Sequence, residues 1–380
     1  MKFISFNKLN ILLIYYLCFA LGLALIAANK PALNWDMVGY AAAAKHFEIS
    51  DPVELHSYIF KELKNTVSET DYFRLTNNNN QRRIDVATHA DLFHQQMPFF
   101  EMRPIYSLSI LALSKTGMTL FTASYFISIV TVFFGIIILF FAIRERVHTG
   151  FLYILPWFLV SFGLLSVAQL STPDGLAFLV LCLFIYLFNY RCFLSLLLIL
   201  PLFVLVRTDF IIFIFLILSA IFILYQQYRV KVIFSFLAAI LLYLGVNHVF
   251  HNYGWAVLFS NSFIKRISNP ADVSVSISIM DYLHALIKGL HKSLKDYPFY
   301  AFLCLSSINL VFIHSMKIKF LKNKDIWIYV IIPVLYVVFH FLLFPATWRR
   351  FFIGFYLMNV LSLFMLLTQQ INKHKIHQKS

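Results

Sequence analysis

Apolar segments long enough to cross a lipid bilayer follow one another along most of this chain of 380 residues. A transmembrane helix needs about 20 apolar residues, within a range of roughly 17–25. We predict membrane spans at 11–28, 117–143, 151–169, 174–189, 192–206, 209–225, 232–250, 298–316, 326–344 and 351–369. The sequence therefore predicts an all-α polytopic transmembrane protein with about ten spans plus interfacial helices, forming a single integral membrane domain over residues 1–380.

The composition separates this chain from soluble proteins. Hydrophobic residues make up 61% of the chain and charged residues 13%, whereas a soluble domain carries roughly 25% charged residues. The formal net charge is +14, but a nucleic-acid-binding protein gathers its basic residues on one soluble surface. Here the basic residues are scattered between apolar segments. We therefore exclude nucleic acid as a partner and attribute the positive charge to membrane topology.

The distribution of lysine and arginine predicts the orientation in the membrane. With the N-terminus in the cytosol, 14 Lys and Arg fall in cytoplasmic segments, and only Arg207, Arg349 and Arg350 fall in the short turns on the other side. Basic residues in short loops favour the cytoplasmic side. We therefore expect both termini in the cytoplasm and the long loops 29–102 and 251–297 outside it. The lack of an Asn-x-Ser/Thr sequence favours a bacterial inner membrane.

Shorter segments are expected to form helices that do not cross the membrane. Residues Trp35–Phe47 and Val53–Lys64 lie in the first outer loop, and we expect helices lying over the membrane there. Residues 103–115 are amphipathic but too short to span, which predicts a re-entrant or interfacial position. The first apolar run follows a basic start, as in a signal peptide, but the Ala-Asn-Lys-Pro after it is a poor cleavage site. We therefore expect an uncleaved first span.

Ionisable residues gather at the outer edge of the predicted membrane region. They are Asp36, Glu101, Arg103, Asp174, Arg207, Asp209, Arg349 and Arg350. Purely structural roles are available: Asp174 can stabilise a helix start, Arg207 can pair with Asp209, and the late arginines can reach lipid headgroups. Because ionisable groups at membrane depth are costly, their concentration on one face points to a functional site.

Arginines and carboxylates at a membrane surface suit one kind of chemistry. The guanidinium group stays charged and binds phosphate through paired hydrogen bonds. A carboxylate can take the proton from an attacking hydroxyl or amine group. Together they fit glycosyl transfer from a sugar linked to a lipid phosphate, because the lipid tail explains why the site lies at the bilayer.

At these residues the chain resembles the GT-C superfamily of membrane glycosyltransferases, which use polyprenyl-phosphate-linked sugars. The family places an essential aspartate early in its first outer loop, where this chain has Asp36 in Trp35-Asp36-Met37-Val38-Gly39-Tyr40. Members often carry an Arg-Pro-Ile/Leu-Tyr stretch before the second full span, as Arg103-Pro104-Ile105-Tyr106 does here. A span opened by Pro173-Asp174 and a late outer arginine, Arg349 or Arg350, are also common in the family.

The resemblance implies a role for each of these residues. Asp36 would be the catalytic base or the acid that orients the acceptor, while Arg207, Arg349 and Arg350 would neutralise the donor phosphate. Of the last two arginines we favour Arg349 slightly, because it lies nearer the outer end of the turn. Glu101, Arg103, Asp174 and Asp209 would shape the pocket. The family's second acid matches Asp51, Glu54, Asp85, Asp91 and Glu101 equally well, so a divalent metal ion as cofactor stays open.

The sequence thus predicts a transferase that moves a sugar from a polyprenyl-phosphate donor to a glycan, lipid or protein acceptor. Its partners would be that donor, the acceptor and the lipid bilayer. One alternative is a secondary transporter or lipid flippase, which favours charges at the bilayer midplane, repeated halves and broken helices. Another is an O-antigen ligase or polymerase, which shares the substrate class but carries its large outer loop late in the chain. Charges at the membrane edge and the larger first loop favour the transferase.

Overall fold

The computed structural model describes residues 6–320 and 323–377, and within these ranges the chain is helical. The only β-type pairing in the described part is an isolated bridge between Ala32 and Leu170. The prediction of an all-α fold is confirmed for the described residues.

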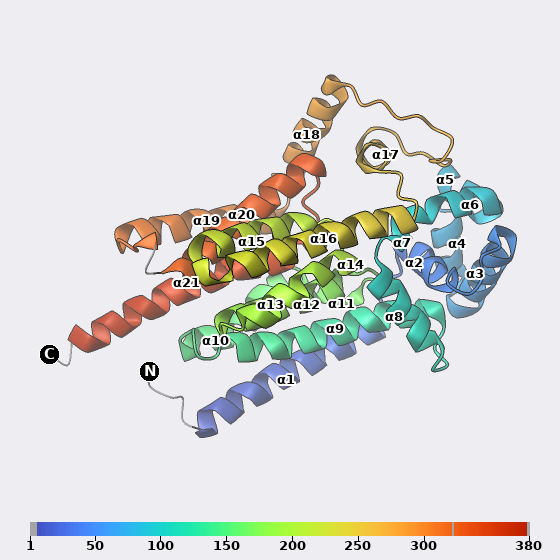
Figure 1. The fold of residues 1–380 in the computed structure, drawn as a ribbon. Coiled ribbons are helices and arrows are strands. Elements are labelled where there is room, and N and C mark those ends of the chain that lie inside the picture. The colour runs from blue at the N-terminus through green and yellow to red at the C-terminus, as the bar shows by residue number, and fades with distance from the viewer. Residues whose placement is uncertain (1–5, 321–322, 378–380) are drawn as a thin grey trace.

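A bundle of apolar helices forms the body of the molecule (Figure 1). Its members are α1 (Phe6–Asn29), α9 (Leu120–Ile143), α10 (Thr149–Ser161), α11 (Leu164–Gln169), α12 (Asp174–Asn189), α13 (Phe193–Ile199), α14 (Phe203–Val206), α15 (Phe210–Leu224), α16 (Arg229–Val249), α19 (Tyr297–Ser315), α20 (Lys324–Leu343) and α21 (Arg349–His377). Every predicted span coincides with one or two of these helices.

Six of these helices are long and apolar enough to cross a membrane. They cover Asn10–Asn29, Leu120–Ile143, Gln226–Val249, Tyr297–Ser315, Lys324–Leu343 and Arg349–Lys373. The other four predicted spans are shorter apolar helices, Thr149–Ser161, Asp174–Asn189, Phe193–Val206 and Phe210–Leu224. At about 1.5 Å of rise per residue, 13 to 16 residues cover only about 20–24 Å. The prediction of about ten spans is therefore supported for six helices by length.

Local backbone features shorten two of these segments. The predicted span 151–169 is divided between α10 and α11 because Gly163 adopts a left-handed conformation with φ +97°, which ends the first helix. The predicted span 192–206 consists of α13, one 3₁₀ turn at Leu200–Leu202 and α14. Pro201 stands in that turn and lacks the backbone N–H that a continuous helix needs.

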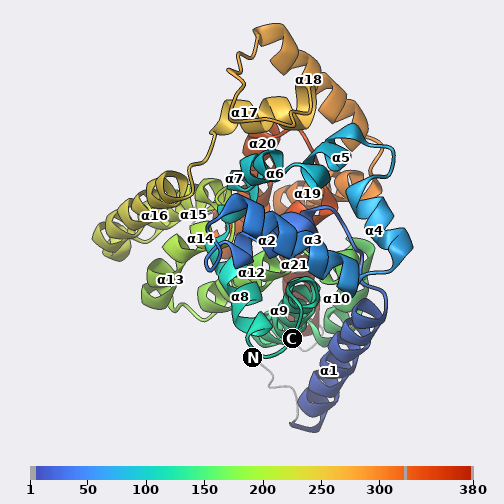
Figure 2. The same cartoon turned by 90° about the vertical axis from the view of Figure 1, so that its right-hand side faces the viewer.

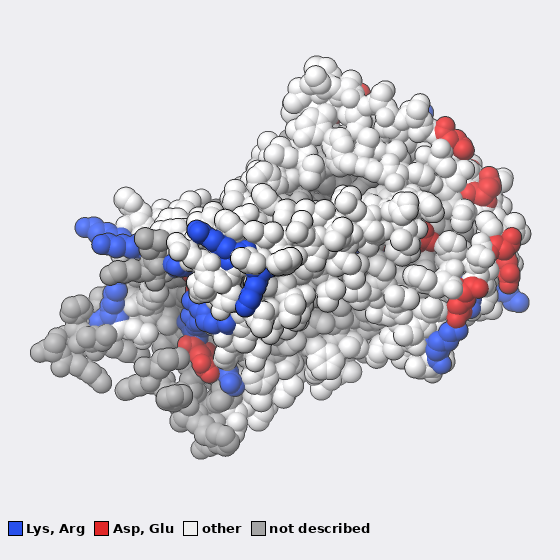
Figure 3. All heavy atoms as spheres, viewed as in Figure 1, with Lys and Arg blue, Asp and Glu red and all other residues white. Residues whose placement is uncertain are grey.

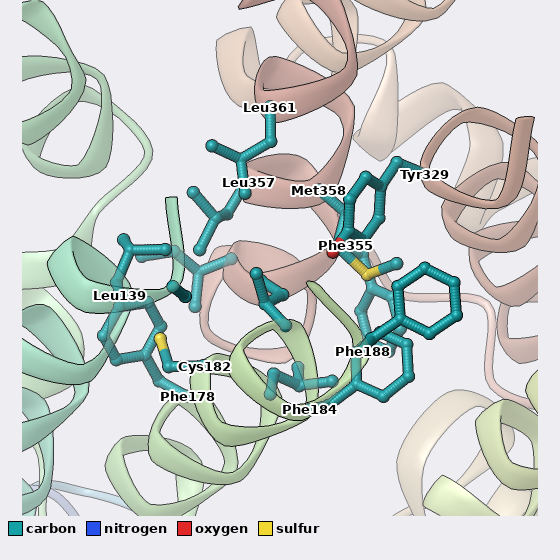
Figure 4. Packing of buried hydrophobic residues seen from close by; sticks show 14 of the residues in the cluster. Leu139, Phe178, Cys182, Phe184, Phe188, Tyr329, Phe355, Leu357, Met358 and Leu361 are labelled. Carbon is teal, nitrogen blue, oxygen red and sulfur yellow. The ribbon is translucent and has the colours of Figure 1, made fainter. Parts of the chain in front are cut away.

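The core of the bundle lies between α9, α12, α20 and α21. Phe178, Phe184 and Phe188 from α12 are buried against Leu139 of α9, Tyr329 of α20 and the α21 side chains around Phe355 (Figure 4). Aromatic side chains of this size each bury about 150–250 Å². Their mutual packing fixes how the ends of these helices are placed, and the candidate site lies at one of those ends.

A layer of short helices covers one end of the bundle, and we call it the cap. It comprises α2 (Asp36–Lys45), α3 (Pro52–Thr66), α4 (Glu69–Thr76), α5 (Gln81–Thr88), α6 (Ala90–Gln96) and α7 (Pro98–Glu101). Figure 2 shows α2 and α3 lying across the bundle end. The two helices expected near Trp35–Phe47 and Val53–Lys64 are confirmed.

The cap has its own hydrophobic core. Buried residues of α2, α3 and α6 pack with α8 (Pro104–Ser114) and the first turns of α9, separately from the core of the bundle. Local signals define its helices: the Asp51 carboxylate accepts backbone N–H bonds from Val53 and Glu54 at 3.1 and 2.8 Å, ahead of Pro52. The predicted short segment 103–115 is α8, whose 11 residues are too few to span.

The second long loop contains α17 (Trp255–Phe259), one π-helical turn (Ser260–Ile264) and the amphipathic helix α18 (Ile279–Ser293). These lie at the cap end, whereas α1 starts and α21 ends at the opposite end (Figure 1). On the face shown in Figure 3, acidic side chains gather on the cap and basic side chains gather at the end with the termini. This polarity matches the charge asymmetry on which the predicted orientation depends.

Candidate functional site

Four ionisable residues predicted from the sequence join in one network where the cap meets the bundle. Asp36 starts α2, Asp174 starts α12, Arg207 follows α14, and Arg350 stands in the first turn of α21. Asp209, two residues after Arg207, extends the network toward α20. Acids at helix starts are favoured by the helix dipole, whereas an arginine there is not. The unfavourable interaction of Arg350 with the dipole of α21 is therefore offset by its carboxylate partners.

Arg350 joins two carboxylates from distant parts of the sequence. Its Nη1 donates a hydrogen bond to Asp36 Oδ2 at 2.9 Å, and its Nε lies 3.6 Å from Asp174 Oδ2. The Arg350 side chain is 21% exposed and that of Asp36 is 32% exposed. Both groups are thus accessible from solvent, while the Asp174 side chain, at 2%, is closed off.

Arg207 is enclosed between two carboxylates. Its Nη1 donates to Asp174 Oδ1 at 2.6 Å, and its Nε and Nη2 donate to the two oxygens of Asp209 at 3.0 and 2.8 Å. Its side chain is only 5% exposed. The pairing of Arg207 with Asp209 considered from the sequence is present. Because these donors are taken up within the protein, Arg207 holds the two acids in place.

Direct backbone packing places Asp174 at this depth. Gly175 follows it, and a Cβ atom there would stand 2.9 Å from the Cα and the carbonyl oxygen of Ser128 in α9. The start of α12 therefore rests on the backbone of α9, an approach that only glycine permits. Thr172 donates from Oγ1 to Asp174 Oδ2 at 2.7 Å, and Ser128 donates to the Thr172 carbonyl at 3.1 Å.

Two further members of the network come from α20 and were missed by sequence analysis. The Tyr336 hydroxyl donates to Asp209 Oδ2 at 2.8 Å, and His340 Nε2 lies 3.4 Å from the same oxygen. Tyr336 also stacks on Phe355, with ring centroids 3.8 Å apart. A usable signal existed: residues 336 and 340 share one helix face, and a histidine inside an apolar span is costly.

The two adjacent arginines of α21 face different partners. Arg349 donates from Nε and Nη2 to Asp296 Oδ1 at 3.1 and 3.0 Å and lies over the Tyr297 ring at 4.6 Å. Consecutive helical residues point about 100° apart, so one arginine turns toward Asp36 and the other away. The structure places Arg350 in the network, although the sequence gave a slight preference to Arg349.

Glu101 and Arg103 lie in or beside the cap, and their contacts are with cap residues and not with the network. Glu101 is buried and hydrogen-bonded to His46, and this bond raises the pKa of the His46 imidazole above its usual 6.5. Arg103 donates to the Phe99 carbonyl at 2.5 Å and lies 5.8 Å from the Tyr40 ring centroid. Both residues therefore help to fix the position of α2, the helix that carries Asp36.

A cavity of about 620 Å³ opens beside the network. Residues 345–350, the later part of α11 with the residue after it, and the C-terminal part of α18 with the segment that follows surround it. Its lining residues are Ser166, Leu170, Gly289, Lys292, Ser293, Lys295, Asp296, Pro345, Ala346, Thr347, Trp348, Arg349 and Arg350. It therefore brings four basic side chains together with one acid, and Arg350 belongs to both the cavity and the network.

Close contacts hold α18 as a wall of this cavity. A Cβ atom on Gly289 would stand 2.3 Å from the Pro345 carbonyl oxygen, so the helix rests on the backbone of the turn. The Thr347 hydroxyl donates to Ser293 Oγ at 2.7 Å. Sequence analysis did not identify Lys292 or Lys295, because their place at the cavity depends on this long-range packing.

The acids of the site do not make a metal centre. Among the residues that the structure describes, no three His, Cys, Asp or Glu side chains lie close enough to hold a metal ion. The position between Asp36 and Asp174 is taken by the guanidinium group of Arg350. The donor set therefore does not fit a divalent ion.

Comparison of the chain with protein-family models, curated proteins and solved structures found no match. The class defined by fold and site is thus an all-helical protein with six helices long and apolar enough to cross a membrane and a charged, partly buried site at the capped end of its bundle.

Proposed function

We propose that the protein is a membrane glycosyltransferase of the GT-C type that transfers a sugar from a polyprenyl-phosphate donor to an acceptor. The observation that carries this proposal is the position of Arg350, which contacts Asp36 and Asp174 and also lines the cavity of about 620 Å³. A cation suited to phosphate and a carboxylate suited to proton transfer thus meet at the edge of one cavity.

In this proposal the basic lining of the cavity holds the donor phosphate. Arg350 is accessible, and Arg349, Lys292 and Lys295 line the same space. Arg207 balances the charge of the buried carboxylates, since its hydrogen bonds go to Asp174 and Asp209. This assigns the direct phosphate contact to Arg350, since Arg349 is paired with Asp296, and gives Arg207 the role of a positioning residue.

Asp36 is the proposed base. The acceptor hydroxyl attacks the anomeric carbon of the sugar, the bond from that carbon to the phosphate oxygen breaks, and the acceptor proton passes to the Asp36 carboxylate. The electron pair of the broken bond leaves with polyprenyl phosphate, whose charge Arg350 balances. The hydrogen bond from Arg350 at 2.9 Å orients the carboxylate while leaving it 32% exposed to an incoming acceptor.

The surroundings of the cavity suit a lipid-linked substrate. Helix α18 exposes Ile279, Met280 and Ile287, and the nearby Trp348 is also exposed. Apolar side chains on an amphipathic helix, together with an interfacial tryptophan, are typical of a protein surface at the membrane boundary. A polyprenyl tail can therefore stay in the bilayer while its phosphate reaches the basic lining.

The proposed topology follows the sequence. The four shorter helices complete ten crossings by lying among the six long ones, as in the GT-C fold, with both termini in the cytoplasm of a bacterial inner membrane. The cap and the site then face the extracytoplasmic side. The gathering of basic side chains at the end with the termini supports this orientation (Figure 3).

The experiment that tests this function follows bond cleavage directly. Purified protein in micelles receives a polyprenyl-phosphate sugar labelled in the sugar, with a mixture of lipid and glycan acceptors, and released polyprenyl phosphate is measured. We expect turnover to fall about 10²–10⁴-fold in Asp36→Asn, which keeps the size of the side chain but loses the base. Asp272→Asn is the matched control, since this exposed cap-end carboxylate accepts a hydrogen bond from Gln95 and lies outside the network of Asp36. Turnover in Asp36→Asn equal to that of the control would exclude Asp36 as the base.

A secondary transporter is the second candidate, because two segments of the bundle are interrupted. The division of α10 from α11 and the 3₁₀ turn between α13 and α14 are breaks of the kind that transporters use at their binding sites. The same labelled donor separates the two functions in sealed vesicles. A transporter moves the intact donor across the bilayer, whereas the transferase releases polyprenyl phosphate.

A further inference from the structure

A second charged cavity lies at the end of the bundle opposite the cap. It measures about 650 Å³ and is formed by the ends of α9, α12 and α15, the start of α20 and the last part of α21. Its lining includes Arg146, Arg191, Lys324 and Asp325. None of the residues of the network around Asp36 lines it, so this cavity is separate from the site proposed for glycosyl transfer.

One carboxylate in this cavity forms ion pairs with two guanidinium groups. Arg191 Nη2 lies 2.7 Å from Asp325 Oδ2, and Arg146 Nη1 lies 3.4 Å from the same oxygen. The side chains of Arg146 and Arg191 are 36% and 42% exposed, whereas that of Asp325 is 13% exposed. The single carboxylate neutralises only one of the two guanidinium charges, so a net positive charge remains. Both guanidinium groups are accessible.

Lys324 adds a cation without a carboxylate partner in the part of the chain that the structure describes. Its ammonium group donates to the Leu224 carbonyl at 2.7 Å and lies 5.0 Å over the Tyr225 ring. The other acid of the lining, Glu145, lies 3.9 Å from Arg144, which is not a lining residue. The cavity therefore has an excess of positive charge in its lining.

Arg191 is held in an unusual backbone conformation. It has φ +60°, in the left-handed region that glycine or asparagine adopts with less strain. Its guanidinium group lies over the rings of Phe188, Phe193 and Tyr225, at 5.7, 5.8 and 5.7 Å, and donates to the Tyr225 hydroxyl at 2.7 Å. An arginine kept at a strained turn and fixed by aromatic rings is typical of a binding position.

We propose that this cavity binds a phosphate group, supplied by an anionic lipid headgroup or by a soluble phosphate ester. Two planar guanidinium groups and one ammonium group match the oxygens of a phosphate. Basic pockets between membrane helices are suited to anionic headgroups. The volume of about 650 Å³ leaves room for the headgroup beyond the phosphate. The site lies at the end of the molecule far from Asp36 and does not depend on the proposed transferase function.

Lys324→Gln tests the proposal, because it removes a cation without breaking an ion pair. Native mass spectrometry of the full chain in neutral micelles gives the Kd for dioctanoyl phosphatidylglycerol and for glycerol phosphate. Loss of one charge-assisted hydrogen bond should raise the Kd about tenfold or more. Lys324→Arg should bind within a few-fold of wild type, which separates loss of charge from loss of fold. The matched control is Lys319→Gln, an exposed lysine outside the cavity lining.

Each outcome decides the proposal. Weakened binding in Lys324→Gln with unchanged binding in Lys319→Gln supports the site. Binding of the lipid alone assigns the phosphate to a headgroup, and equal binding of glycerol phosphate assigns it to a soluble ester. The proposal is overturned if neither probe binds, if Lys324→Gln binds within twofold of wild type, or if the control loses as much affinity.

Discussion

Arg207→Met is the substitution that tests the buried part of the network most directly. Methionine approximates the length of the side chain but removes the cation that lies between Asp174 and Asp209. Asp174 would keep the Thr172 hydroxyl at 2.7 Å and Arg350 at 3.6 Å, and Asp209 would keep Tyr336 and His340. Removing one member of a buried ion pair costs about 3–5 kcal/mol, because the remaining charge stays desolvated. We expect a loss in that range, a factor of roughly 150 or more in the folding equilibrium at 3 kcal/mol.

Arg349→Met is the matched control at the neighbouring position of the same helix. Arg349 and Asp296 form an ion pair whose side chains are 43% and 22% exposed. Exposed pairs contribute about 0–1 kcal/mol after screening by solvent. The same substitution should therefore have at most a small effect there, although the two arginines are adjacent in sequence.

Reversible unfolding of the purified protein in mixed micelles measures both variants. Adding Asp209→Asn to Arg207→Met should restore part of the lost stability, because a neutral amide costs less to bury than an unpaired carboxylate. If the free energies of unfolding of Arg207→Met and Arg349→Met agree within about 0.5 kcal/mol, the network does not stabilise the fold as argued. A double variant less stable than Arg207→Met alone would also contradict the reasoning.

Three further expectations follow from the same contacts. For donor affinity, Arg350→Lys should weaken binding by about 1.5–3 kcal/mol, since lysine lacks the planar fork that meets a phosphate, whereas Arg349→Lys should change it much less. An Arg350→Lys variant that binds the donor like wild type in a titration would remove Arg350 from the phosphate site. The topology is tested in a variant without the four native cysteines. Glu69→Cys on the cap should react with an impermeant thiol reagent added outside intact cells, while Lys319→Cys at the other end should not. The reverse labelling would invert the orientation. For pH dependence, the raised pKa of His46 means that its bond to Glu101 contributes stability below about pH 6.5 and loses it as the pH rises through the folded-state pKa. Hydrogen exchange of cap amides should therefore increase from pH 6 to pH 8.5 beyond its intrinsic rise, and His46→Gln should abolish that excess.

Much of the fold could be predicted from the sequence because it depends on local physical signals. The apolar runs predict the bundle helices, and the helix predicted over Val53–Lys64 agrees with α3 within a few residues. The pairing of Arg207 with Asp209 was also predictable, since the two residues are neighbours in a turn. Span count was less predictable, because hydropathy does not show that Gly163 divides one apolar run into two helices.

The candidate site divides in the same way between sequence and structure. The sequence by itself determined which ionisable residues lie at the edge of apolar spans, where a charge is energetically costly. It thereby singled out Asp36, Asp174 and the late arginines. Only the tertiary structure decided that Arg350 rather than Arg349 meets Asp36, 314 residues away, because this depends on the rotation of α21 about its own axis. Likewise Tyr336 and the lysines of α18 reach the site through packing between distant segments. Periodicity and composition report the environment of a residue, whereas the identity of its partner is set by how the helices pack.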